Sequence, residues 1–170
     1  MIGALLLCVV INANPRADAY VMSFGGDGQS FYMVNESIPR LQEIKKRYGS
    51  DFLWARRDGR AYVIRDRALL ARVSDLFEPQ RALEPEVRQV SKEESKLDHE
   101  IDSLEDRDED DRPLTSAERE RLHDLKIRYR EVERREKELD DRQEELERQA
   151  ERQLWRMIDR AIRDGVAVRE

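Results

Sequence analysis

Two apolar repeats in the C-terminal half constrain the fold of this chain more than any other feature. Their members recur in alternating steps of three and four residues, if Glu94 is accepted as a polar position in the first repeat. Such spacing places one apolar stripe along a long α-helix, as in a coiled coil. The first repeat comprises Val87, Val90, Leu97, Ile101 and Leu104; the second comprises Leu122, Leu125, Tyr129, Val132, Leu139, Leu146 and Ala150, and is weakened by Glu136 and Gln143.

The segment between the repeats predicts how the two helices are connected. The acidic run at 105–113, EDRDEDDRP, is typical of a loop, and Thr115 with Glu118 forms a capping box for the next helix. Folding back across this loop brings Leu104 near Leu122, which predicts an antiparallel helical hairpin over 87–164. We expect its last turns to pack on the first domain or on another chain, and 165–170 to be a tail. The run lacks the glycine and the alternation of an EF-hand, so we expect no calcium there.

The composition agrees with an extended architecture. Charged residues make up 41% of the chain and aromatic residues 6%, which is too polar for one thick core throughout. Residues 1–84 carry 12 Lys and Arg against 10 Asp and Glu, whereas residues 85–170 carry 20 against 28. Neither half has the basic excess of a general nucleic-acid-binding protein, so we expect no nucleic-acid partner.

The residues between 20 and 49 predict a hairpin followed by a short helix. Two β-prone runs flank the glycines at 25–28, which supply the positive φ that tight turns need. Ser37 is a suitable helix cap, Pro39 follows in the first turn, and Gly49 marks the end. Leu41, Ile44 and Tyr48 share one face of this amphipathic helix.

Residues 51–66, DFLWARRDGRAYVIRD, predict a second hairpin around Asp58-Gly59, a pair suited to a type I′ turn. Counting outward pairs Arg57 with Arg60, Arg56 with Ala61, Ala55 with Tyr62, Trp54 with Val63 and Leu53 with Ile64. We therefore expect Leu53, Trp54, Val63 and Ile64 to hold the fold. Arg56, Arg57 and Arg60 gather at the tip, either as a solvated turn or as the contact site for an anion or an acidic partner.

A further helical pattern follows Asp66, with Leu69, Leu70 and Val73 on one side, until Pro79 and Pro85 interrupt it. The predicted fold class is therefore α+β: a small ββαββ N-terminal unit followed by a long antiparallel helical hairpin, or coiled coil. The expected domains are a signal peptide at 1–19, a small α+β domain at 20–78, a proline hinge at 79–86, the hairpin at 87–164 and the tail at 165–170.

The N-terminal residues indicate export. An apolar run at 2–11 is too short to span a bilayer, and Ala17-Asp18-Ala19 matches a signal-peptidase site before Tyr20. The alternative interpretation is a buried N-terminal strand or helix. Leu7 precedes Cys8, where a lipoprotein signal needs a small residue, so we expect no lipid anchor. The mature chain would contain no cysteine, which excludes disulfides and thiol chemistry.

Catalytic patterns are not found in the sequence. The segment HEIDS, which begins at His99, has Ser103 where a zinc peptidase motif needs its second histidine. The other histidine, His123, lies in the charged second repeat. The many carboxylates fit solvated helix faces better than the partly dry pocket that acid–base catalysis requires. We therefore expect no enzyme activity, no cofactor and no metal site.

Two segments carry a resemblance to a known group of proteins. RYGSDFLWARRDGRAYVIRD (47–66) and LWRMIDRAIRDGVAV (154–168) resemble segments of bacterial exported proteins and of the extracytoplasmic part of some BlaR-type antirepressor metallopeptidase homologues. Those homologues carry transmembrane helices and a zinc motif that this sequence lacks, so no catalytic residue is carried over. Between the two segments the relatives tend to have glutamine-rich helical repeats, whereas this chain has Arg/Glu-rich ones. The resemblance implies an extracytoplasmic accessory or sensor-like module.

The expected function is that of a non-catalytic exported module for protein interaction or sensing, periplasmic or extracellular. Its partner is another protein, with a membrane protein among the candidates, or a second copy bound through the coiled coil. Two alternatives remain: an accessory or regulatory subunit of a membrane metallopeptidase, and a periplasmic holdase chaperone.

Overall fold

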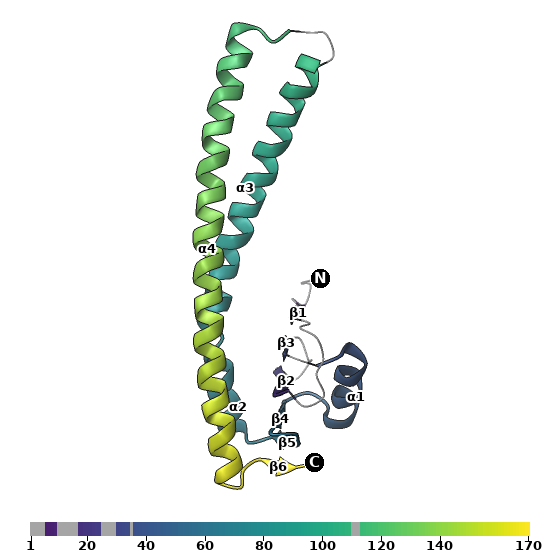
Figure 1. Cartoon of the computed structure of the whole chain (residues 1–170). Helices are drawn as coiled ribbons and strands as arrows, with labels where there is room; N and C mark the ends of the chain where they lie inside the picture. The colour runs from purple at the N-terminus through teal and green to yellow at the C-terminus, as the bar shows by residue number, and fades with distance from the viewer. Residues whose placement is uncertain (1–5, 10–16, 25–29, 35, 110–112) are drawn as a thin grey trace. The chain divides into compact units, whose positions relative to one another are not determined.

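The computed structural model describes residues 6–9, 17–24, 30–34, 36–109 and 113–170, and the chain divides into two units (Figure 1). Unit 1 comprises residues 1–77 and 150–170, and unit 2 comprises residues 78–149. Helix α4 (Ser116–Arg163) crosses the boundary at residue 150 and contributes to both units. The predicted α+β class is confirmed, because antiparallel strands are followed by long helices.

Unit 1 is built on a six-stranded sheet in the order β1-β3-β2-β4-β5-β6. The strands are β1 (Leu6–Val9), β2 (Ala19–Phe24), β3 (Ser30–Val34), β4 (Phe52–Arg57), β5 (Arg60–Ile64) and β6 (Val168–Arg169). The pairing is antiparallel except between β1 and β3. The predicted unit lacked β1 and β6. The expected tail is therefore wrong at 168–169, because these residues extend the free edge of β5.

The β4–β5 hairpin has the predicted register. Trp54 lies opposite Val63, Leu53 opposite Ile64 and Arg57 opposite Arg60. Asp58 has φ of 50° and Gly59 has φ of 71°, as a type I′ turn requires. Strands β2 and β3 pair as expected of the first hairpin, whose turn at 25–28 lies outside the described residues.

Helix α1 (Ile38–Tyr48) covers one face of this sheet. Ser37 caps it by accepting a hydrogen bond from the backbone N–H of Arg40 at 3.4 Å, and Gly49 ends it with φ of 79°. Its Leu41 and Ile44 pack on the alternate side chains of the strands that face them. The sheet side of this core consists of Ala19, Val21, Phe52, Trp54 and Val63.

The opposite face is covered by α2 (Arg67–Asp75) and by the last turns of α4, which lie across the sheet from α1 (Figure 1). Asp66 caps α2 by accepting from the N–H of Leu69 at 2.8 Å. Leu154 and Ile158 of α4 are fully buried there. The expectation that these turns pack on the first domain is confirmed, so residues 150–164 belong to unit 1 rather than to the hairpin. The buried partners include Met22, Leu53, Ile64, Leu70 and Val73.

The predicted proline hinge at 79–86 is wrong, because these residues are helical. Helix α3 (Glu78–Glu109) begins just after Phe77 and contains both prolines. Pro79 lies in the first turn, where a backbone N–H has no helical partner to lose. Pro85 removes one helical hydrogen bond without ending the helix. The helix also continues into the acidic run as far as Glu109, so the predicted loop at 105–113 begins too early; residues 110–112 lie outside the described part.

Unit 2 consists of α3 packed antiparallel on the first two thirds of α4. Glu118 accepts from the N–H of Thr115 at 2.9 Å and donates its own N–H to the Thr115 hydroxyl at 3.3 Å, which confirms the capping box. The apolar repeats face each other along a common seam. Its buried members include Val90, Leu97, Ile101, Leu104, Leu125, Val132 and Leu139. No helix in the described part of the chain is long and apolar enough to cross a bilayer.

Truncation of Trp54 tests the hairpin register. Trp54 is 1% exposed, so Trp54→Ala is expected to lower the free energy of unfolding by about 3–5 kcal/mol through the lost contacts and the cavity left behind. The matched control is Trp155→Ala, whose half-buried ring should cost less. Urea unfolding followed by circular dichroism measures both. An equal loss for the two variants would contradict the central place of Trp54.

Candidate interaction site

The tip of the β4–β5 hairpin is held by ion pairs, so the first of the two interpretations, a solvated turn, does not describe Arg56 and Arg57. Arg56 is only 15% exposed at its side chain and donates from Nη1 to Glu36 at 2.8 Å and from Nε to the Ala17 carbonyl at 2.9 Å. Arg60, in contrast, is exposed. Arg60 is therefore the tip arginine best placed for the predicted partner contact.

Arg57 joins the beginning of β2 to the end of α4. Its Nε and Nη2 donate to the two carboxylate oxygens of Asp159 at 3.0 and 3.1 Å, and its Nη1 contacts Asp18. The guanidinium also lies 5.0 Å from the ring centre of Trp155. Burial opposes the charged form, but the bonds to Asp159 and Asp18 outweigh it and raise the pKa of Arg57. A bidentate ion pair of this kind fixes the orientation of the guanidinium group and also pairs its charge with a carboxylate.

These contacts involve the residues of the predicted signal-peptidase site. Ala19 is fully buried as the first residue of β2, Asp18 binds Arg57, and the Ala17 carbonyl binds Arg56. Cleavage before Tyr20 would remove all three. Strand β1 corresponds to the alternative interpretation of the apolar run, while export itself stays a prediction.

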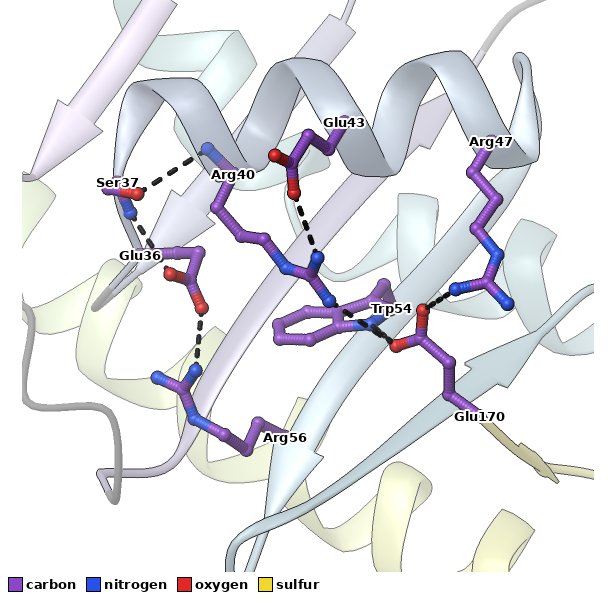
Figure 2. Close-up of polar contacts among 8 residues, drawn as sticks. All are labelled: Glu36, Ser37, Arg40, Glu43, Arg47, Trp54, Arg56 and Glu170. Carbon is purple, nitrogen blue, oxygen red and sulfur yellow. Dashed lines mark hydrogen bonds and ion pairs between the residues drawn. The ribbon is translucent and has the colours of Figure 1, made fainter.

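A second polar cluster lies on the α1 side of the sheet, around the Glu170 carboxylate (Figure 2). Trp54 donates its Nε1–H to Glu170 at 2.9 Å, Arg47 forms an ion pair with it, and Arg40 lies 3.6 Å away. The guanidinium groups of Arg40 and Arg56 each lie 5.9 Å from the centre of the Trp54 ring. The buried indole therefore fixes the position of the carboxylate.

The charge state of Glu170 follows from these donors. Burial alone would raise its pKa, but hydrogen bonds from Trp54 and Tyr48, with the charges of Arg47 and Arg40, lower the pKa of Glu170 below its usual value. Glu170 follows β6, Trp54 lies on β4, and Arg40 and Arg47 lie on α1, so the cluster joins one helix and two strand regions that are distant in the sequence. Sequence reasoning missed it because no local pattern connects residues 40 and 170.

A third polar cluster interrupts the seam of unit 2. Glu94 of α3 and Glu136 of α4 occupy seam positions and are half-buried, and the Tyr129 hydroxyl donates to Glu94 at 3.5 Å. Loss of surrounding water, followed by the negative charges of Glu94 and Asp140, raises the pKa of Glu136. The same seam positions were identified from the sequence as polar interruptions. The structure shows that two of them meet.

The charges beside the seam differ between its two sides. On one side Arg121, Arg128 and Arg135 of α4 pair with Glu100, Glu93 and Glu86 of α3, at 3.0, 3.6 and 2.9 Å. On the other side Lys126 pairs with Glu105 at 2.6 Å, but Asp98, Glu133 and Asp140 add negative charge near the polar interruption. One side is therefore neutralised and the other is acidic.

Replacement of Arg57 tests the ion pairs at the hairpin tip. Arg57→Gln should lower the free energy of unfolding by about 1–3 kcal/mol, because Asp18 and Asp159 lose a charged hydrogen-bond partner. Arg60→Gln is the matched control at the facing position and should change it by less than about 0.5 kcal/mol. Chemical denaturation measures the free energy of unfolding of both variants. Equal effects would contradict a stabilising role for the ion pairs of Arg57 and would favour a solvated side chain.

Glu136 and Glu170 should respond to pH in opposite ways. An acid whose pKa is raised by folding destabilises the fold once the pH exceeds its unfolded pKa, here 4.5. Glu136→Gln should therefore stabilise the protein at neutral pH, with the gain disappearing in acid below that value. The pKa of Glu170 is lowered, so Glu170→Gln should destabilise at neutral pH and have no effect in strong acid. Thermal unfolding across pH measures both; a pH-independent effect of Glu136→Gln would contradict the assignment.

The described surface therefore offers an exposed arginine at the hairpin tip and two long charged helix faces. Among the described residues, no group of three or more His, Cys, Asp or Glu side chains is placed to hold a metal ion, and His99 and His123 are exposed. These features are suited to contact with another macromolecule. Comparison of the chain with protein-family models, with curated proteins and with solved structures finds no match.

Proposed function

We propose that this protein is a non-catalytic exported module for protein interaction or sensing, which associates through the coiled coil formed by α3 and α4. The observation that carries this proposal is the polar interruption of the seam by Glu94, Glu136 and Gln143. Polar residues at such positions reduce stability and select the partner and register of a coiled coil. A hairpin kept only for its own stability has no need of them.

Export is supported by the apolar run at 2–11 and the Ala17-Asp18-Ala19 sequence. The exported location, periplasmic or extracellular, makes an envelope protein the expected class of partner. Unit 2 has more acidic than basic residues, and its arginines lie in the same rows as glutamates, which suits a protein partner better than nucleic acid.

A second candidate function, regulation of a membrane metallopeptidase, has a separate observation in its favour. The two segments that carry the resemblance, 47–66 and 154–168, come together in unit 1. Leu53 and Ile64 of the first pack with Leu154 and Ile158 of the second, although a long stretch of chain separates them. This candidate predicts altered peptidase activity on addition of the purified chain.

Sedimentation equilibrium of the full chain tests the proposed association. The apparent mass should rise reversibly with protein concentration, and hydrogen exchange should show stronger protection of α3 and α4 as it rises. Crosslinking in the native envelope would then identify any further partner. A monomer at every concentration, with the amides of both helices already fully protected, would contradict the proposal.

A further inference from the structure

The side of the hairpin that carries the three Arg–Glu pairs has an ordered arrangement of charge. We call this side the ladder face: Arg121–Glu100, Arg128–Glu93 and Arg135–Glu86. Successive pairs are seven residues apart on each helix, so they form one row along the hairpin. Each pair joins opposite charges, and the row itself is therefore close to neutral.

Positive charge lies on the α3 side of the ladder face. Arg88, Lys92 and Lys96 are exposed and four residues apart, so they follow one another along the helix surface. They line a shallow hollow together with Glu93 and Arg128 of the ladder. Arg88 lies 3.6 Å from Glu84 of its own helix, whereas Lys92 and Lys96 have no ion pair within the described residues.

Negative charge lies on the α4 side of the same face. Asp124, Glu131 and Glu138 are exposed and seven residues apart. Glu131 and Glu138 line a second hollow, which shares Glu93 and Arg128 with the first. Arg134 lies 3.3 Å from Glu138 within α4 and reduces the charge at that end. Asp124 and Glu131 have no ion pair in the described part of the chain.

The two charged rows lie at the same height along the hairpin. Because Glu93 pairs with Arg128 and the helices are antiparallel, Lys92 and Lys96 of α3 are level with the stretch of α4 that contains Asp124 and Glu131. The ladder face is thus positive along one edge and negative along the other. A two-fold rotation about an axis parallel to the helices keeps each height and exchanges the two edges.

We propose that the ladder face is the interface with a second copy of this chain, in which the basic row of α3 in each copy lies against the acidic row of α4 in the other. The inference rests on the proposed self-association and names its surface. An unrelated acidic partner would use only the basic row, whereas a second copy uses both. Such a two-fold contact repeats every pairing twice, as closed homodimers do.

Charge reversal on the full chain tests this interface. The basic-row variant is Arg88→Glu, Lys92→Glu, Lys96→Glu, and the acidic-row variant is Asp124→Lys, Glu131→Lys, Glu138→Lys. In each variant alone, like charges face each other, and the dimer dissociation constant should rise by at least about a hundredfold. An equimolar mixture of the two should form mixed dimers, and a chain with all six changes should dimerise like the wild type.

The readouts separate this inference from the proposed function. Circular dichroism and thermal unfolding verify that each variant keeps its helices, which the exposed positions lead us to expect. If the wild type dimerises and both folded variants dimerise equally well, the ladder face is not the interface, although the proposed association stands. A monomeric wild type would overturn both. If a triple variant fails to fold, the chain with all six changes and single Lys92→Glu supply the same comparison.

Discussion

Burial of one face of the sheet beneath the last turns of α4 is the contact on which the rest of unit 1 depends. Leu154 and Ile158 are fully buried against Leu53 and Ile64, whose strands lie about ninety residues earlier in the sequence. The burial of each such side chain contributes roughly 1.5–3 kcal/mol. The same helix end places Asp159 beside Arg57 and leads the chain back to β6. Without it the sheet would have α1 on one face and only α2 on the other.

The charged side chains of the two units differ in charge state and in their contribution to stability, because their surroundings differ. Around Glu170 the indole N–H of Trp54, the Tyr48 hydroxyl and two arginines outweigh the effect of burial, so the carboxylate is held in its charged form. In the seam of unit 2, Glu136 is shielded from water and its charged neighbours are other acids, so the charged form is disfavoured. On the ladder face the pairs are mostly exposed, and such pairs contribute little to stability. Their regular order matters more for what the surface recognises than for how firmly it folds.

Local signals in the sequence predicted the local structure well. Asp58-Gly59 set the register of a hairpin, Ser37 and Thr115 marked the beginnings of helices, and the seven-residue spacing identified the seam. Pro79 and Pro85 misled the prediction, because a proline near a helix start is compatible with the helix and one further along weakens it without ending it. Strand β6 was missed because two residues carry no readable pattern.

The candidate contacts were harder to predict than the elements that position them. The tip arginines meet their acidic partners only once the sheet and α4 are assembled; these partners are Asp18, Asp159 and Glu36. No pattern near Arg56 or Arg57 in the sequence predicts these contacts. The register of a hairpin predicts which face of the sheet a side chain occupies. It does not predict which residues from other elements will contact that side chain. The polar seam positions were different, because a periodic pattern reveals its own interruptions.

Unit 1 is discontinuous in the sequence, and this has a consequence for the order of events during synthesis. Its sheet is completed by β6 and covered by residues from 150 onward, so β5 and the sheet face beneath α4 emerge from the ribosome long before their last partners. Pairing across so long an intervening segment is slow, because the loop-closure entropy must be overcome first. The free edge of β5 and this face of the sheet therefore stay open until the end of α4 and β6 are available. A chain that has not yet closed is also the form that a translocation channel accepts, so late closure is compatible with the proposed export.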